Sequence, residues 1–129
     1  MKSWKLVGPG QLTMEESAPT VLQQGFVKVK VEEILFSSLD LCLYNGTFKR
    51  KYPFVLGRNA VGVVSEVYDK DKSLLKKMDR VVIEPYIVCN RCAECLEGDF
   101  ERCTDLQYMG QNSEGLFKNF VDVSINQAH

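Results

Sequence analysis

Four of the five cysteines in this 129-residue chain lie close together, and this cluster limits the fold more than any other feature. The segment VCNRCAECLEGDFERC spaces them as C-x2-C-x2-C-x7-C, at Cys89, Cys92, Cys95 and Cys103. The total is odd and Cys42 lies far from the others, so the pattern favours one four-ligand site and a free thiol over paired disulfides.

The spacing predicts a structural zinc site. Zn²⁺ takes four thiolates in a tetrahedron, and a closed four-cysteine site leaves no position for water or substrate. The tight C-x2-C turns present two sulfurs to one ion, and Gly98 lets the chain bend before the last cysteine returns. We therefore expect one structural zinc per chain, held by Cys89, Cys92, Cys95 and Cys103 in a lobe over about residues 88–104.

Two alternatives fit the cysteines less well. An iron–sulfur cluster also uses four cysteines, but the bacterial ferredoxin run is C-x2-C-x2-C-x3-C followed by proline. Here the last gap is seven residues and Thr104 follows Cys103. Four unrelated buried cysteines would have no reason to share such spacing.

Composition and charge narrow the class of protein. With 45% hydrophobic residues the chain is long enough for a single domain over residues 1–129. A net charge of −1, with both signs spread along the chain, gives no reason to expect a nucleic-acid or lipid partner. The start MKSWKLVGPG lacks the apolar run of a signal peptide, and no segment approaches the roughly 20 apolar residues of a membrane span. We expect a cytoplasmic protein, whose reducing surroundings favour metal ligands over disulfides.

The remaining sequence predicts short strands. In FVKVKVE, residues 26–32, valines alternate with charged residues, as in a sheet with one buried and one wet face. Further strands are expected at residues 60–67, 80–85 and 117–123. SSLDLCLYNG predicts a helix that begins after Ser37 or Ser38 and ends at Gly46. Residues 69–79 are expected to form a charged loop with one helical turn. This pattern favours a mainly β barrel or sandwich.

A known family resembles this chain over most of its length. The run MDRVVIEPYIVCNRCAECLEGDFERC is similar to the structural-zinc lobe of the zinc-containing medium-chain alcohol dehydrogenases. The resemblance extends through VKVKVEEILFSSLDLCLYNG, PFVLGRNAVGVVSEV and YMGQNSEGLFKNFVDV. It implies the family's N-terminal GroES-like domain, a partly open β-barrel with short helices and a zinc-binding lobe. Met78 stands where the family usually has glycine, so we expect a different local turn.

The family also holds a catalytic zinc, and the resemblance places its ligand positions at unsuitable residues. Ser37 stands at the ligand cysteine, Arg58 at the ligand histidine and Asn59 at the neighbouring glutamate. A serine hydroxyl and an amide are poor zinc ligands, and a guanidinium only donates hydrogen bonds. The one histidine is His129, the last residue of the sequence. We therefore expect that the catalytic zinc is lost, and the sequence does not identify catalytic residues.

Nearby residues have structural as well as functional interpretations. Arg58 could bind a substrate carboxylate or polarise a carbonyl, but isolated arginines more often pair with a local carboxylate, so we expect that role. Cys42 lies between two leucines and is expected to be an inert core thiol. Asp40 is expected to cap or brace the helix rather than act as an acid.

Two functions from different classes follow. The first is the substrate-side domain of an NAD(P)-dependent oxidoreductase acting on a small alcohol or carbonyl compound. A nicotinamide cofactor needs a strand, a G-x-G-x-x-G turn and a helix, which this chain lacks, so NAD or NADP would bind a Rossmann domain in a longer parent. That parent could be a homo-oligomer, and the chain alone is expected to be inactive. The second function is a stand-alone zinc-stabilised binding or scaffold module without catalysis.

Overall fold

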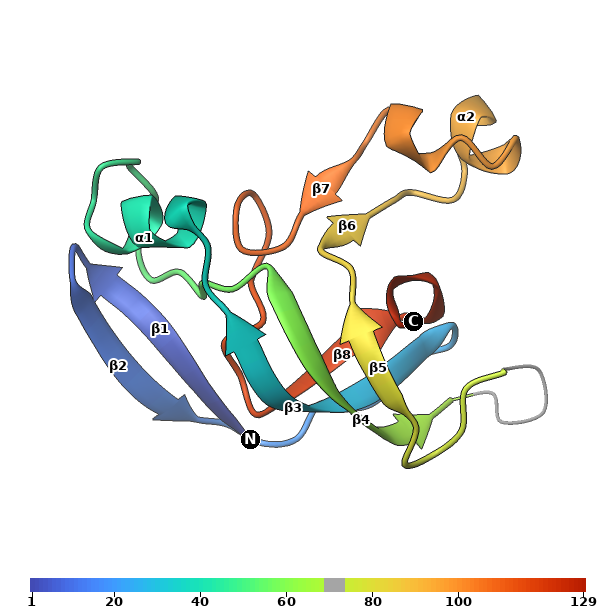
Figure 1. Cartoon of the computed structure of the whole chain (residues 1–129), viewed down its shortest axis with the longest axis horizontal. Helices are drawn as coiled ribbons and strands as arrows, with labels where there is room; N and C mark the ends of the chain where they lie inside the picture. Colours follow the sequence, from blue (N-terminus) through green and yellow to red (C-terminus); the bar gives the residue numbers. More distant parts are fainter. Residues whose placement is uncertain (69–73) are drawn as a thin grey trace.

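The chain is built around a four-stranded antiparallel sheet with two small hairpins attached to it (Figure 1). The computed structural model describes residues 1–68 and 74–129. The central sheet has the order β5-β4-β3-β8, and the hairpins are β1-β2 and β6-β7. The strands are β1 (Lys2–Gly8), β2 (Gln11–Glu16), β3 (Phe26–Leu35), β4 (Asn59–Val67), β5 (Arg80–Ile83), β6 (Tyr86–Ile87), β7 (Gln107–Tyr108) and β8 (Phe120–Ser124). The helices are α1 (Ser38–Tyr44), α2 (Ala93–Leu96) and the 3-10 helices Phe100–Arg102 and Ile125–Gln127.

The far edge of the sheet curls back onto the segment that follows β8. Ile83 at the end of β5 forms an isolated antiparallel bridge with Ala128. Val82 and His129 exchange two backbone hydrogen bonds, of 2.8 and 3.0 Å. The contact is a single bridge, so the barrel is only partly closed, which confirms the expected mainly β, partly open architecture.

Aliphatic side chains from all four central strands form the main core. Its members are Val27, Val29, Ala60, Val64, Val67, Val81, Ile83, Met109, Leu116, Val121, Val123 and Ala128. A smaller cluster of Leu6, Leu43, Phe54 and Leu56 lies where α1 packs against β1 and the loop before β4. Gly62 is required where β4 crosses β3, because a Cβ there would collide with the backbone carbonyl of Lys30.

The predicted strands are confirmed with shifted ends. The strand predicted at residues 26–32 continues to Leu35. The strand predicted at residues 80–85 ends at Ile83, because Pro85 has no N–H to donate. The strand predicted at residues 117–123 begins at Phe120. Before it, the peptide groups of Phe117 and Asn119 form isolated hydrogen bonds with β1 and β3 rather than a continuous ladder. The strand at residues 60–67 starts one residue earlier.

Other expectations need correction. Lys28 was expected on the wet face of β3 but is only 9% exposed. Its ammonium group donates to the Asp122 carboxylate at 2.9 Å and to two oxygens of Thr20, and these partners make burial of the charge tolerable. Met78 adopts φ +79°, the left-handed conformation that glycine favours, so the turn before β5 takes a glycine-like backbone without glycine.

The helical predictions have a mixed outcome. α1 forms as expected after Ser37, and Gly46 follows its end with φ +85°. Of the expected charged loop at residues 69–79, residues 69–73 lie outside the described part, and residues 74–79 contain no helical turn. Among the described residues, no helix is long and apolar enough to cross a membrane.

Candidate metal centre

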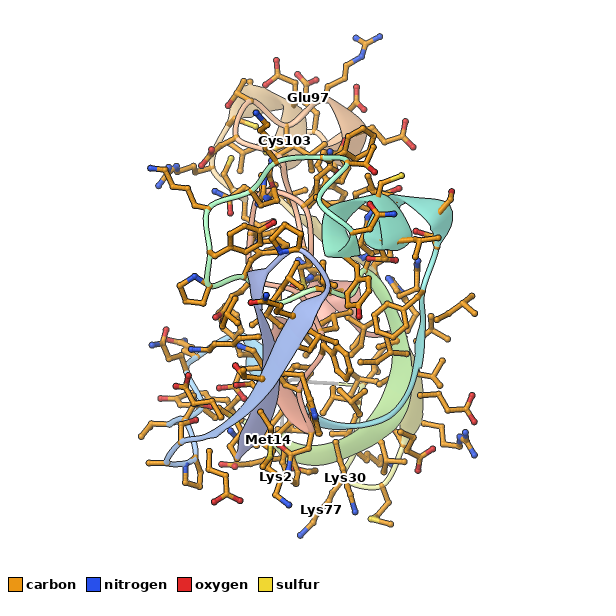
Figure 2. All side chains as sticks on the ribbon, turned by 90° about the vertical axis from the view of Figure 1, so that its left-hand side faces the viewer. Lys2, Met14, Lys30, Lys77, Glu97 and Cys103 are labelled. Atoms are coloured by element: carbon orange, nitrogen blue, oxygen red, sulfur yellow. The ribbon has the colours of Figure 1, made fainter. Side chains whose placement is uncertain are left out.

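The four clustered cysteines lie in a lobe between β6 and β7, at one end of the molecule (Figure 1). Figure 2 places Glu97 and Cys103 of this lobe at the end opposite Lys2 and Lys77. The lobe consists of a turn after β6, the short helix α2, a bend at Gly98 with φ +84°, and one 3-10 turn. Cys92 caps the start of α2, Cys95 lies within α2, and Cys103 follows the 3-10 turn.

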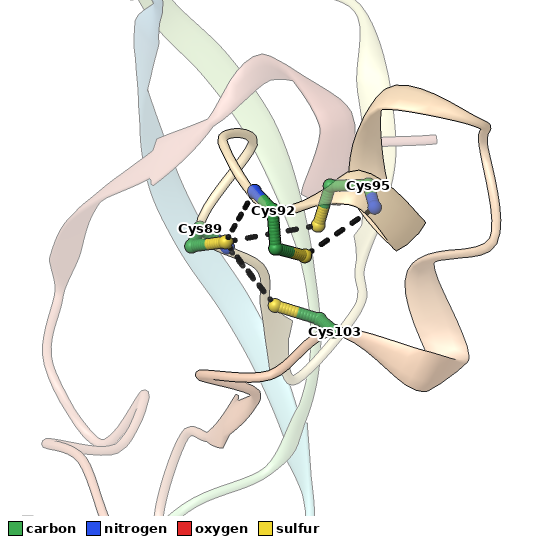
Figure 3. A group of neighbouring side chains, drawn as sticks. All are labelled: Cys89, Cys92, Cys95 and Cys103. Atoms are coloured by element: carbon green, nitrogen blue, oxygen red, sulfur yellow. Dashed lines mark hydrogen bonds between the residues drawn. The ribbon is translucent and has the colours of Figure 1, made fainter.

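The four sulfur atoms converge on one point (Figure 3). They all lie within 4.8 Å of one another. Cys89 Sγ lies 3.9 Å from Cys95 Sγ and 3.5 Å from Cys103 Sγ. A tetrahedral ion with Zn–S bonds near 2.3 Å holds its sulfurs about 3.8 Å apart. The cysteines form no disulfide, and their arrangement fits a tetrahedral thiolate-bound ion.

Backbone N–H groups point at three of the sulfurs. The N–H of Cys92 donates to Cys89 Sγ at 3.4 Å, and the N–H of Cys95 donates to Cys92 Sγ at 3.4 Å. The N–H of Cys89 donates to Cys103 Sγ at 3.3 Å. Such donors stabilise the charged form of the sulfur, so the lobe is built to hold thiolates.

The acid–base properties of the thiols agree with this geometry. Backbone hydrogen bonds from Thr104 and Cys95 lower the pKa of Cys92 to about 6. A backbone hydrogen bond from Cys89 lowers the pKa of Cys103. Burial, followed by the interaction with Cys92, raises the pKa of Cys95 to about 12. The protein alone therefore cannot ionise all the sulfurs near neutral pH, and a divalent cation would supply the missing positive charge.

The lobe has almost no apolar core of its own. Over residues 88–106 only Cys95 and Cys103 are buried. The large apolar side chains Leu96 and Phe100 are 75% and 44% exposed. Apolar burial therefore cannot account for the conformation of this segment, whereas a bound ion linking four side chains can.

The structure brings together the two segments that carry Ser37, Arg58 and Asn59. Asn59 begins β4 and pairs with Leu35, the last residue of β3, two positions before Ser37. The Ser37 N–H and Oγ–H both donate to one oxygen of the Asp40 carboxylate, at 2.7 and 2.9 Å. Asp40 thus braces the start of α1, as predicted.

Arg58 differs from its expected structural role. It forms no ion pair with any residue of the described part of the chain, and its Nε is buried without a hydrogen-bond partner. Its side chain passes over Gly110, where a Cβ would lie 3.0 Å from Arg58 Cγ. The Arg58 guanidinium is therefore available to a group from outside the described chain.

Cys42 is half-buried, so it is not the core thiol that the sequence predicted.

Elsewhere the described residues offer little metal chemistry. Within residues 1–68 and 74–129, the cysteine cluster is the one group of three or more His, Cys, Asp or Glu side chains close enough to share an ion. None of these clustered side chains lies beside Ser37, Arg58 and Asn59 at the start of β4.

Sequence reasoning did not identify the backbone donors or the aromatic stem of the lobe. The donors come from peptide groups, which carry no residue-type signal. Tyr86 and Tyr108 flank the cysteine run in β6 and β7 and stack edge to face with ring centroids 5.3 Å apart. Their place on either side of the lobe was the signal that could have identified its stem.

Comparison with known families identifies the fold. The model of the alcohol dehydrogenase GroES-like domain matches residues 23–129. The chain belongs to this family. Its lobe, barrel and helix α1 are therefore those of a GroES-like domain, as the resemblance implied.

Related proteins are considerably longer than this GroES-like chain. The starvation-sensing protein RspB of Escherichia coli strain K12 is 30% identical over 129 residues, which are 99% of this chain and 38% of that protein. An L-threonine 3-dehydrogenase of Symbiobacterium thermophilum is 30% identical over 120 residues, 90% of this chain and 34% of that enzyme. The crystal structure of an RspB alcohol dehydrogenase from E. coli CFT073, complexed with NADH, has a TM-score of 0.84 at 30% identity. It aligns with 100% of this chain, which covers 37% of that structure.

Proposed function

We propose that this chain is the substrate-side domain of an NAD(P)-dependent, alcohol dehydrogenase-like oxidoreductase that acts on a small alcohol or carbonyl compound. Residues 1–129 form one domain, and the nicotinamide cofactor binds a separate Rossmann domain of a longer parent. Support comes from the family match and from longer relatives, one of them named an L-threonine 3-dehydrogenase, of which this chain spans 34–38% of the length.

Cys89, Cys92, Cys95 and Cys103 hold one zinc ion with a structural role. When bound, the ion supplies a cross-link between four side chains and the charge that keeps the sulfurs deprotonated. With four protein ligands the ion has no position for substrate, so these residues stabilise the lobe and take no part in a reaction. The converging sulfurs and the missing apolar core of the lobe support this assignment.

The catalytic zinc of the family has been lost from this chain. The observation that carries this proposal is the pairing of Leu35 with Asn59, which brings Ser37 and the Arg58–Asn59 pair to the same end of the sheet. None of these three side chains is a good zinc ligand, and a guanidinium repels a cation.

Hydrogen-bond donors take over the orientation of the substrate carbonyl. Ser37 already donates its hydroxyl proton to Asp40, so it is not free to donate to a ligand. Arg58 lacks an ion-pair partner in the described chain, and the Asn59 side chain is exposed. We assign Arg58 and Asn59 as the donors that hold the carbonyl oxygen; a nicotinamide bound in the parent would supply the hydride.

The test compares two arginines of the full-length parent. Arg58→Met should lower kcat/KM about 100-fold, the usual cost of losing a donor to a developing oxyanion, with zinc content and melting temperature unchanged. Arg50→Met is the matched control, because Arg50 also has a buried, unpaired Nε but stacks over Phe54 at 4.4 Å. Equal activity of the two variants would refute the role of Arg58. A reading frame that ends at His129, or a full-length protein that binds no dinucleotide, would favour the non-catalytic module instead.

A further inference from the structure

The stem of the cysteine lobe holds Cys89 and Cys103 close to each other. The last pair of the β6-β7 ladder joins Ile87 to Gln107. Cys89 follows β6 and Cys103 precedes β7, so this ladder brings their two segments together. The N–H of Cys89 donates to Cys103 Sγ at 3.3 Å, and the two sulfurs lie 3.5 Å apart (Figure 3). All these contacts are made by atoms of the protein itself, so they do not depend on a bound ion.

The other two cysteines of the cluster are placed by the short helix α2. Cys92 is the N-cap of this helix and Cys95 lies inside it. The helix spans only four residues, far fewer than an isolated helix needs to be stable. Its place in the lobe therefore depends on the ion that Cys92 and Cys95 share with the two stem cysteines.

The chemistry of a zinc-bound sulfur makes the stem pair reactive. A cysteine that binds zinc does so as a thiolate, which is the nucleophilic form of the side chain. Thiolates are oxidised by peroxides to sulfenic acids, and a sulfenic acid condenses with a neighbouring thiol to a disulfide. For Cys89 that neighbour is already 3.5 Å away, at Cys103. Condensation therefore competes well with further oxidation of the sulfenic acid.

We propose that Cys89 and Cys103 form a reversible disulfide when hydrogen peroxide oxidises the zinc-loaded lobe. One thiolate of the pair attacks a peroxide oxygen, the O–O bond breaks, and the sulfur becomes a sulfenic acid as hydroxide leaves. The other thiolate attacks this sulfur, forms the S–S bond and displaces a second hydroxide. The two sulfurs lose two electrons to the peroxide, and two protons convert the two hydroxides into water. Zinc leaves because two of its four thiolate ligands are gone.

The oxidised lobe keeps its stem and loses the anchor of α2. The new bond replaces the ion as the link between Cys89 and Cys103, whereas Cys92 and Cys95 become free thiols. A dithiol reverses the reaction by thiol–disulfide exchange, after which zinc can bind again. This proposal rests on the structural zinc of the proposed function. It does not involve Arg58 or a nicotinamide cofactor, so it can fail without affecting the oxidoreductase assignment.

Stepwise oxidation of the full-length, zinc-loaded protein tests the proposal. Hydrogen peroxide is added, released zinc is followed with a colorimetric chelator, and disulfides are mapped by peptide mass spectrometry after alkylation of the free thiols. Each chain should lose its zinc as a Cys89–Cys103 disulfide forms, with Cys92 and Cys95 recovered in the alkylated form. Dithiothreitol followed by zinc should restore the four thiols and the bound ion.

Two variants that each remove one zinc ligand separate the stem pair from the loss of metal. Cys92→Ser keeps both stem cysteines and should form the same disulfide, whereas Cys103→Ser should lose most of the disulfide yield. A main disulfide between Cys92 and Cys95, equal yields in the two variants, or zinc retained in excess peroxide would each overturn the proposal. A wild-type sample that holds no zinc before peroxide is added would overturn the structural zinc and, with it, the zinc release.

Discussion

Replacing Cys92 by serine should separate the metal's contribution to stability from that of local backbone structure. Cys92 is the N-cap of α2, and its sulfur accepts the N–H of Cys95 at 3.4 Å. Serine is among the preferred N-cap residues, so the oxygen of Cys92→Ser can accept the same N–H and the helix start is preserved. A hydroxyl is a far weaker zinc ligand than a thiolate. The loss of stability can therefore be assigned to the ion.

The expected size follows from the coordination. Structural zinc contributes roughly 10–16 kcal/mol to folding in small metal-dependent peptides, or about 3 kcal/mol per ligand of a four-ligand site. The lobe buries only two residues, both of them cysteines, so no apolar core compensates for a weakened site. A loss of about 3 kcal/mol lowers the melting temperature of a domain of this size by about 10 °C.

The assay combines differential scanning calorimetry with zinc analysis of the same purified samples. Cys42→Ser is the matched control, because Cys42 is half-buried and outside the cluster. It should keep its zinc and lose about 1 kcal/mol or less. If Cys92→Ser keeps one zinc and melts within about 2 °C of the wild-type protein, the structural role assigned to the metal is wrong.

Three further predictions concern pH and buried polar groups. Zinc should stay bound from pH 8 to about 6 and be released on further acidification. The lowered pKa of Cys92, about 6, keeps its thiolate available down to that pH, below which protons compete with the ion for the sulfur. Release is followed with a colorimetric chelator, and release that begins above pH 7 would contradict this prediction. Lys28→Ala should cost about 3 kcal/mol in urea unfolding, because it leaves the Asp122 carboxylate, 21% exposed, without its cation. Lys5→Ala should cost under about 1 kcal/mol, because its partner Glu15 is 54% exposed. Similar losses in the two variants would refute the difference. Asp40→Ala should cost about 2 kcal/mol in the same assay by removing the acceptor at the start of α1, and an unchanged midpoint would disprove that brace.

The predictable part of the fold is the part with a clear period or composition. Strand β3 was evident because Val27 and Val29 alternate with charged residues, and both valines are fully buried. The hairpin β1-β2 was missed because every residue of β2 is exposed, so no apolar alternation marks it. Lys28 was placed on the wrong face because its burial depends on Asp122, 94 positions away, and local patterns do not report such partners.

The candidate site shows the same division. Spacing alone was enough to predict that four sulfurs would converge, since the ligands lie within one short segment. The free guanidinium of Arg58 was not predictable, because only the folded chain reveals whether a carboxylate reaches it.

The metal content of the purified protein tests the central claim most directly. Elemental analysis by mass spectrometry, after exhaustive dialysis, should give one zinc per chain for the wild-type protein and less than one for Cys92→Ser, whose three remaining thiolates hold the ion more weakly. One zinc is the number expected if Cys89, Cys92, Cys95 and Cys103 hold an ion and Ser37, Arg58 and Asn59 do not. Two zinc ions per chain would contradict the loss of the catalytic site, and iron or an absence of metal would contradict the structural zinc itself.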